Sequence, residues 1–161
     1  MGHAPATDGP KLESMSSGLR ELRVWQEAVS LAGDVIRSLR ASARRETKAV
    51  SDGVMLTALS VGSHIADGFA RPSAAEQKES YLAAKRALFR LESELAVARH
   101  AELMPAGSLS DFAARSSQVA RLLTGYLVYL DRQLAERDAP ASTSAGTPGG
   151  SATRDSARVP A

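Results

Sequence analysis

The sequence predicts an all-α protein: an antiparallel up-down-up-down four-helix bundle with disordered N- and C-terminal tails. In four successive segments, apolar residues recur every three or four positions, which is the spacing of one helix face. No segment shows the period-two alternation of half-buried strands, and no Asn-Gly or Asp-Gly turn joins two apolar runs. Short connections between long helices return the chain alongside itself, which favours the up-down-up-down order.

The large apolar side chains lie almost entirely in the middle of the 161-residue chain. Residues 1–18 and 139–161 are rich in Ala, Pro, Gly, Ser and Thr. Such segments bury too little apolar surface to offset the entropy lost on ordering, so we expect both tails to be disordered. Residues 19–138 remain as one domain, the bundle itself.

The first two helices are expected over residues 19–44 and 48–70, separated by a cluster of charged residues. The apolar face of the first is formed by Leu22, Trp25, Val29, Ala32, Ile36, Leu39 and Ala43. The apolar face of the second is formed by Val50, Val54, Ala58, Val61, Ile65 and Phe69. Both sets have the three- and four-residue spacing of a helix packed against a core.

Pro72 cannot continue the second helix, and Ser73 with Glu76 forms a capping-box pattern that begins a third one. We expect this helix over residues 73–104, with an apolar face of Tyr81, Ala84, Leu88, Leu91, Leu95 and Ala98. A weaker cap precedes the fourth helix, expected over residues 108–138. Its inner face is formed by Phe112, Val119, Leu123, Tyr126, Leu130 and Leu134.

The second and fourth helices carry more apolar side chains than one four-helix core requires. The additional residues are Met55, Leu56 and Leu59 in the second helix and Leu122, Leu127 and Val128 in the fourth. A second apolar stripe on a helix in water is typical of burial against another chain. We therefore expect a homo-oligomer.

A polar cluster in the second helix has the residue types of a catalytic site, because Ser60, His64 and Asp67 share one side of the helix, with Ser63 adjacent. A hydrolytic triad also needs a strained nucleophile and free oxyanion donors, and amides in the middle of a helix are already bonded. We therefore expect capping or inter-helix hydrogen bonds from this cluster and no catalytic residue.

Two glycines in the same helix, Gly62 and Gly68, each reduce helix stability by up to about 1 kcal/mol relative to alanine. Close approach of a neighbouring helix is the compensating reason that we favour over a ligand cleft. The di-metal signature of helical bundles, two Glu-x-x-His motifs, is missing from the sequence, so we expect neither a metal nor a cofactor.

The chain contains no cysteine and no apolar run near 18 residues long, and its N-terminus lacks the basic-then-apolar layout of a secretory signal. We therefore expect a cytoplasmic protein without a membrane segment. The net charge is only +2, but 16 of the 20 basic residues are arginine, whose guanidinium group suits phosphate.

Basic side chains gather around the turn between the first two helices. These residues are Arg37, Arg40, Arg44, Arg45 and Lys48. A solvated surface is one interpretation, and a site that contacts the phosphate backbone of RNA or DNA is the other. In a ring-shaped oligomer the cluster would be repeated around an axis, so that weak contacts add by multivalency.

Three stretches carry a resemblance: residues 22–28 (Leu-Arg-Val-Trp-Gln-Glu-Ala), 60–69 (Ser-Val-Gly-Ser-His-Ile-Ala-Asp-Gly-Phe) and 87–95 (Ala-Leu-Phe-Arg-Leu-Glu-Ser-Glu-Leu). Together they resemble a bacterial four-helix-bundle family named after proteins encoded in intervening sequences of 23S ribosomal RNA genes. The resemblance spans about residues 19–137. The chain departs from the family pattern at Gly62, His64 and Asp67, where the family usually has proline, asparagine and glutamate.

The resemblance implies a left-handed bundle that assembles as a homopentamer and has no established enzyme activity. Relatives include the accessory variability determinant of diversity-generating retroelements, which binds a reverse transcriptase and nucleic acid. We therefore expect a non-enzymatic interaction scaffold for RNA or DNA and a reverse transcriptase. The competing expectation is a structural module for a protein partner, with no nucleic-acid binding.

Overall fold

The computed structural model describes residues 17–42, 44–105 and 107–138. These residues form helices and no strand, which confirms the all-α prediction. The long helices are α2 (Arg23–Ala41), α3 (Lys48–Ala70), α4 (Ala74–His100) and α5 (Ser108–Asp138), and a 3-10 turn, η1 (Arg45–Thr47), precedes α3. The tails expected over residues 1–18 and 139–161 lie outside the described residues, apart from residues 17 and 18, which are helical.

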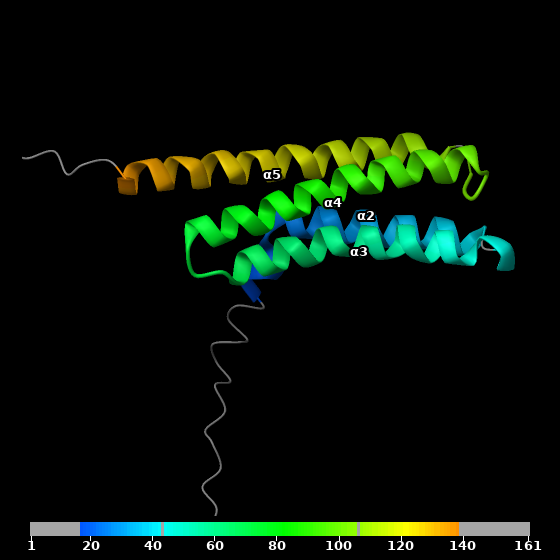
Figure 1. The fold of residues 1–161 in the computed structure, drawn as a ribbon, viewed down its shortest axis with the longest axis horizontal. Helices are drawn as coiled ribbons and strands as arrows, with labels where there is room; N and C mark the ends of the chain where they lie inside the picture. Colours follow the sequence, from blue (N-terminus) through cyan, green and yellow to red (C-terminus); the bar gives the residue numbers. More distant parts are fainter. Residues whose placement is uncertain (1–16, 43, 106, 139–161) are drawn as a thin grey trace, which may run out of the picture.

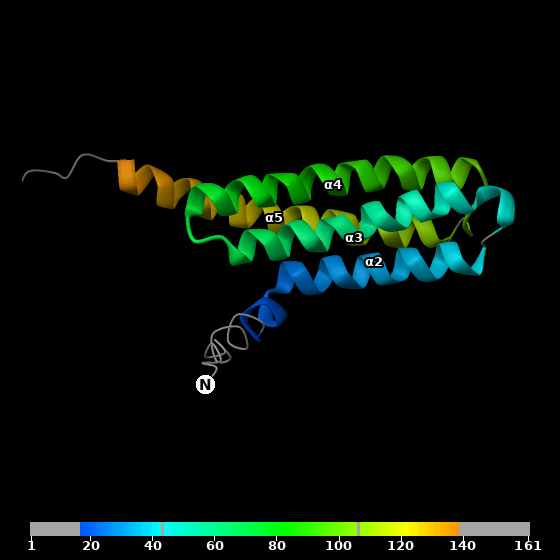
Figure 2. The same cartoon turned by 60° about the horizontal axis from the view of Figure 1, so that its bottom comes forward.

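The four long helices pack around one core. α2 and α4 each contact both α3 and α5, so the helices close into a bundle. Figures 1 and 2 show the helices side by side, with α5 extending beyond the others at its C-terminal end. The α2–α3 and α4–α5 connections lie at one end of the molecule, and the α3–α4 connection lies at the other (Figure 1).

The first expected helix is interrupted at Leu22, whose backbone is extended (φ −72°, ψ 107°), so the helical residues 17–21 are separate from α2. No glycine or proline stands at the break. The turn before the break packs closely on α3, because a Cβ added to Gly18 would lie 3.0 Å from the ring of Phe69. Figure 2 shows this first turn at an angle to α2.

The first expected helix also ends early, at Ala41, because Arg44 is extended (φ −115°, ψ 153°). The Thr47 hydroxyl donates a hydrogen bond of 3.3 Å to the Arg44 carbonyl and closes the 3-10 turn. This tight turn leads into α3, and the basic residues Arg44, Arg45 and Lys48 lie within it or directly beside it.

The N-terminus of α4 is capped by the serine that the sequence predicts. The Ser73 hydroxyl oxygen accepts a hydrogen bond of 3.3 Å from the Glu76 amide and donates one of 2.6 Å to the Glu76 carboxylate. One otherwise unpaired amide of the first turn is thereby satisfied.

The C-terminus of α4, at His100, lies four residues before the expected end. The Leu103 amide donates to the Ala98 carbonyl (2.8 Å) and the Glu102 amide donates to the Arg99 carbonyl (2.9 Å). These two bonds form a Schellman motif, and they require Glu102 to adopt a left-handed conformation with φ 54°. The helix therefore stops although no glycine marks the position.

The core face of α2 differs from the expected face. The most deeply buried side chains of α2 are Val24, Ala28, Leu31, Val35 and Leu39. Ala32 and Leu39 are buried as expected, but Val29 is 45% exposed and Trp25 and Ile36 are only half-buried, so the expected face is correct in part. Ala43, the last residue of that face, lies outside the described residues. α2 carries two adjacent apolar stripes, and packing against α3 and α5 decides which one is the core.

Candidate functional site

The polar cluster predicted in α3 makes hydrogen bonds within its own helix. The Ser60 hydroxyl donates to the Thr57 carbonyl (2.7 Å), and the Ser63 hydroxyl donates to the Leu59 carbonyl (3.1 Å). Both serines therefore use the local backbone bond common to hydroxyl side chains in helices, in place of the expected capping or inter-helix bonds. Neither hydroxyl is held as a nucleophile by a histidine.

His64 is half-buried and Asp67 is exposed on the surface of α3. Within residues 17–42, 44–105 and 107–138, no hydrogen bond or ion pair joins these two side chains to each other or to the serines. Across the same residues, no group of three or more His, Cys, Asp or Glu side chains is placed to hold a metal ion. The arrangement lacks the donor-base-carboxylate chain of a hydrolytic triad.

Gly68, the last residue of the predicted polar cluster, is a packing residue. A Cβ at this position would lie 2.6 Å from Cε1 of Tyr81 in α4, closer than any real contact of this kind. The Tyr81 ring also packs against that of Tyr126 in α5, with 5.9 Å between the centroids and an angle of 53° between the planes. At Gly62 a Cβ would meet only Val29, at an ordinary 3.7 Å, so the close approach inferred for both glycines holds at Gly68 alone.

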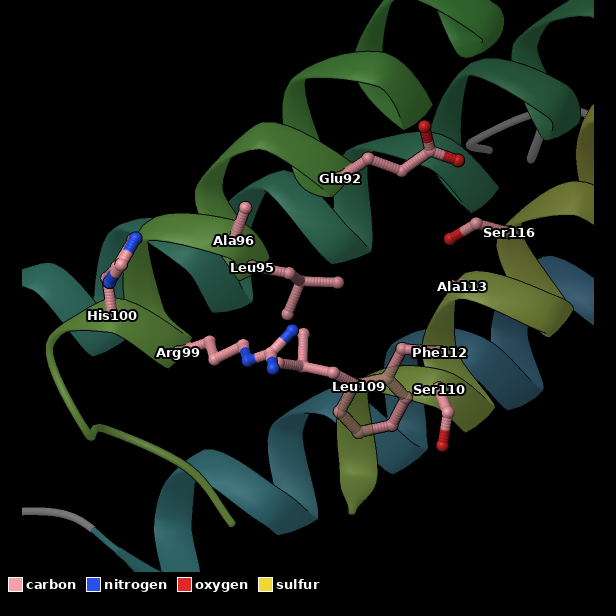
Figure 3. A pocket seen from close by; sticks show the side chains of 10 residues that line it. All are labelled: Glu92, Leu95, Ala96, Arg99, His100, Leu109, Ser110, Phe112, Ala113 and Ser116. Atoms are coloured by element: carbon pink, nitrogen blue, oxygen red, sulfur yellow. The ribbon is translucent and has the colours of Figure 1, made fainter. Parts of the chain in front are cut away.

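Sequence reasoning missed a pocket between α4 and α5. We call it the α4–α5 pocket; its volume is about 750 Å³, and its lining includes Glu92, Leu95, Arg99, Leu109, Phe112 and Ser116. Figure 3 shows the Arg99 guanidinium group and the Glu92 carboxylate at opposite ends, with Leu95 between them. No local signal indicates this pocket, because its two walls are brought together only by the packing of α4 on α5.

Ser116 in α5 lies fully buried in the wall of the α4–α5 pocket, and its hydroxyl has no hydrogen-bond partner among the described residues. The nearby Ser117 and Thr124 hydroxyls each donate to a carbonyl four residues earlier (2.9 and 2.8 Å). A buried hydroxyl that lacks such a bond destabilises the fold by about 1–3 kcal/mol. Figure 3 shows the Ser116 hydroxyl directed toward the interior of the pocket.

Four of the five predicted basic residues gather around a hollow between the end of α2 and the start of α3. This basic hollow, of about 460 Å³, is lined by Arg40, Arg44, Arg45 and Lys48, together with Leu39, Ser51, Asp52 and Met55. The four cations are exposed, and Lys48 forms an ion pair with Asp52. Four positive charges face one carboxylate, so the hollow has a clear excess of positive charge.

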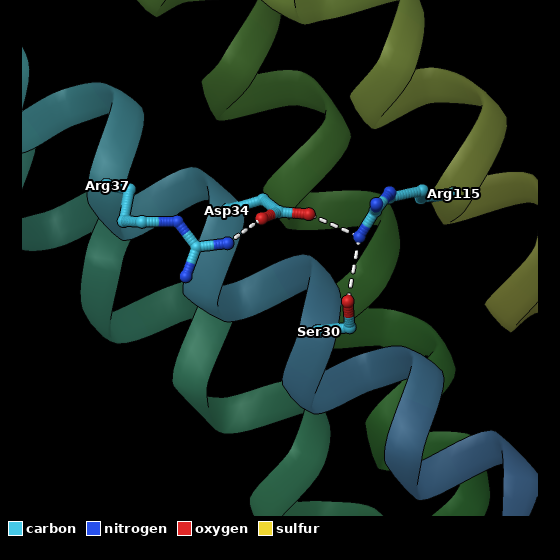
Figure 4. Close-up of polar contacts among 4 residues, drawn as sticks. All are labelled: Ser30, Asp34, Arg37 and Arg115. Atoms are coloured by element: carbon cyan, nitrogen blue, oxygen red, sulfur yellow. Dashed lines mark hydrogen bonds and ion pairs between the residues drawn. The ribbon is translucent and has the colours of Figure 1, made fainter.

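The fifth predicted residue, Arg37, takes part in a separate network. Figure 4 shows the Asp34 carboxylate between Arg37 of the same helix and Arg115 of α5. Arg115 also donates a hydrogen bond of 2.8 Å to the Ser30 hydroxyl. Asp34 partly neutralises Arg37 and ties α2 to α5, so Arg37 contributes less positive charge to a ligand than the other four residues.

An apolar groove runs along α2 and α3, formed by Trp25, Val29 and Ile36 on α2 and by Leu59 and Gly62 on α3; it has a volume of about 440 Å³. Val29 and Leu59 are each about half exposed, and Leu56 of α3 is 67% exposed. Of the second stripe predicted on α3, Leu56 and Leu59 are thus exposed, whereas Met55 is half-buried against the core. Val29, which the sequence assigned to the core face of α2, is exposed beside them. On α5, the predicted Leu127 is buried and Val128 is exposed.

Comparison with known proteins gives one family match. Residues 20–125 match the family model described as 23S rRNA-intervening sequence protein, a range that covers α2, α3, α4 and the N-terminal half of α5. No curated protein matches the chain. Among the described residues, no helix is both long enough and apolar enough to cross a bilayer.

Proposed function

Because the chain belongs to the 23S rRNA-intervening sequence protein family, we propose that it is a non-enzymatic, homo-oligomeric scaffold that binds the phosphate backbone of RNA or DNA. The observation that carries this proposal is the basic hollow, in which Arg40, Arg44, Arg45 and Lys48 surround one concave surface. Guanidinium groups donate paired hydrogen bonds to phosphate oxygens, and counterion release makes such contacts favourable at low salt.

Titration of a fluorescently labelled single-stranded RNA, followed by anisotropy over a series of salt concentrations, tests the proposal. If four cations contact phosphates, the logarithm of the binding constant falls with the logarithm of salt concentration with a slope of about −3. Absence of binding at low salt would contradict nucleic-acid binding. It would favour the alternative of a scaffold for a protein partner.

A binding role is supported over a catalytic one by the polar cluster of α3. The hydroxyls of Ser60 and Ser63 are committed to backbone carbonyls, at 2.7 and 3.1 Å. A serine nucleophile instead needs its proton directed at a base. Substitution of His64 by alanine should therefore leave binding and assembly unchanged.

Self-association is supported by apolar patches on two different sides of the bundle. One is the apolar groove of α2 and α3 with Leu56, and the other lies on α5 at Val128 and Tyr129, each about half exposed. Two unlike patches suit a head-to-tail contact, which closes into a ring when the rotation permits. We propose a pentamer, the state implied by the family resemblance, of antiparallel up-down-up-down protomers. Light scattering at micromolar protein concentration tests it, and a monomeric mass would contradict it.

Our proposal for the biological partner rests on the resemblance to accessory variability determinants. We take a reverse transcriptase of a diversity-generating retroelement as the protein partner and the nucleic acid of that element as the bound polyanion. This proposal predicts a neighbouring reverse-transcriptase gene with paired template and variable repeats. If the surrounding DNA contained neither a reverse-transcriptase gene nor paired repeats, the retroelement role would be contradicted. The proposed scaffold role would not be affected.

A further inference from the structure

The α4–α5 pocket has the size and lining of a small-molecule site. Its volume of about 750 Å³ lies within the ~300–1,000 Å³ typical of such sites. Leu95 and Phe112, each at most 5% exposed, form an apolar floor, and Leu109 stands beside them. An apolar body can therefore lie along the floor, shielded from water on one side.

Charged groups make the two ends of the pocket different. Figure 3 shows the Arg99 guanidinium group beside Leu109, near the first turn of α5. The Glu92 carboxylate lies at the other end, on the same side of the pocket as Ser116. His100, the remaining titratable group of the lining, turns away from the other side chains in this view. An anionic group is therefore favoured at the Arg99 end and a hydrogen-bond donor at the Glu92 end.

The unpaired Ser116 hydroxyl is the independent observation that points to a ligand. The Ser117 and Thr124 hydroxyls of α5 each donate to the carbonyl four residues earlier, whereas Ser116, which is fully buried, makes no such bond. A ligand that hydrogen-bonds to Ser116 would satisfy this group. Because Ser116 is fully buried, a side chain of the pocket wall must rotate to admit the ligand to its hydroxyl, and such rotamer changes are common on binding.

We propose that the α4–α5 pocket binds a small amphipathic carboxylate that carries a hydroxyl group at its far end. The carboxylate pairs with Arg99, the apolar body packs on Leu95 and Phe112, and the hydroxyl accepts from Ser116 and donates to Glu92. The site uses none of the residues of the basic hollow. Its test is therefore independent of nucleic-acid binding.

Two matched probes test the proposal on the full chain: 3-(4-hydroxyphenyl)propionate and 3-phenylpropionate, which differ by one hydroxyl. Calorimetry should show that the hydroxylated probe binds at least about tenfold more tightly, because the phenyl analogue leaves Ser116 unpaired. Amide chemical shifts should change along the facing segments of α4 and α5.

Three variants separate a binding role from a structural one. Ser116→Ala should abolish the preference between the two probes while leaving the melting temperature equal or higher. Arg99→Ala should weaken binding of both probes about tenfold by removing the ion pair with the ligand. Arg86→Ala, an exposed arginine of α4 outside the pocket, is the control and should change nothing. Failure of both probes to bind, or a preference that persists in Ser116→Ala, would overturn the proposal.

Discussion

Gly68 of α3 and Tyr81 of α4 lie so close together that a methyl group on Gly68 would stand 2.6 Å from the tyrosine ring. The ring cannot retreat freely, because Tyr81 is 4% exposed and packs against the ring of Tyr126 in α5. This contact fixes how closely α3 and α4 approach at the end of the bundle where they are connected (Figure 1). It also explains why α3 has a glycine at position 68, in its last turn, where a larger residue would stabilise an isolated helix.

Gly68→Ala should lower the free energy of unfolding. Overpacking a filled site is destabilising by about 1–3 kcal/mol, which outweighs the roughly 1 kcal/mol that alanine adds to helix propensity. Gly62→Ala is the matched control, because its new methyl group would meet only Val29 at 3.7 Å. Urea denaturation should show Gly62→Ala equal to the wild type or more stable. Equal stability of the two variants would contradict the packing role of Gly68.

The stability of the protein should fall at alkaline pH because of Tyr81. Burial, with a smaller effect from Tyr126, raises the pKa of the Tyr81 hydroxyl above its usual value of 10.0. The unfolded chain then releases this proton more readily than the folded one, so stability is retained below pH 10 and declines as the pH rises through the folded-state pKa. Tyr81→Phe should lose less stability than the wild type between pH 8 and pH 11 in denaturant titrations. Identical pH profiles would show that Tyr81 ionises as freely as in water.

Glu102→Gly should stabilise the protein by about 1 kcal/mol, because a left-handed residue other than glycine is strained. Glu102 has φ 54° and closes the Schellman motif at the end of α4. Thermal unfolding measures the effect, and Glu79→Gly, at an exposed position inside α4, is the contrasting control, expected to destabilise by a similar amount. A loss of stability in Glu102→Gly would contradict the conformation assigned to this turn.

Residues at the helix ends account for much of the agreement between the predicted and the observed helices. Pro72 ends one helix, and Ser73 begins the next through the capping bonds that its hydroxyl makes with Glu76. The break at Leu22 has no local signal, because neither glycine nor proline stands at that position. The core phase of α2 could not be chosen from the sequence either, since two adjacent stripes are both apolar and only tertiary contacts separate them.

The candidate sites likewise include residues whose grouping is visible in the sequence and residues that only tertiary contacts bring together. Arg44, Arg45 and Lys48 are neighbours in the chain, so their grouping could be predicted from the sequence. The pairing of Arg37 with Asp34 has helical spacing and was also open to prediction, whereas the link from Asp34 to Arg115 needs the contact of α2 with α5. The unpaired hydroxyl of Ser116 carries no sequence signal at all, because the neighbouring Ser117 has the same side chain and a satisfied bond.

Binding of RNA by a charge-reversed basic hollow tests the central claim most directly. The double variant Arg44→Glu/Arg45→Glu places two carboxylates on the hollow, and Arg86→Glu/Arg132→Glu makes the same change of net charge at exposed positions outside it. Circular dichroism should first show that both variants retain the helical content of the wild type.

Anisotropy titrations with a labelled single-stranded RNA at low salt then compare the variants with the wild type. The account predicts that Arg44→Glu/Arg45→Glu weakens binding more than about tenfold and makes the salt slope shallower by about 1.5, since two phosphate contacts are lost. The control variant should lose only the smaller, long-range part of the attraction. Equal affinities and equal salt slopes for the two variants would contradict a polyanion site at the basic hollow.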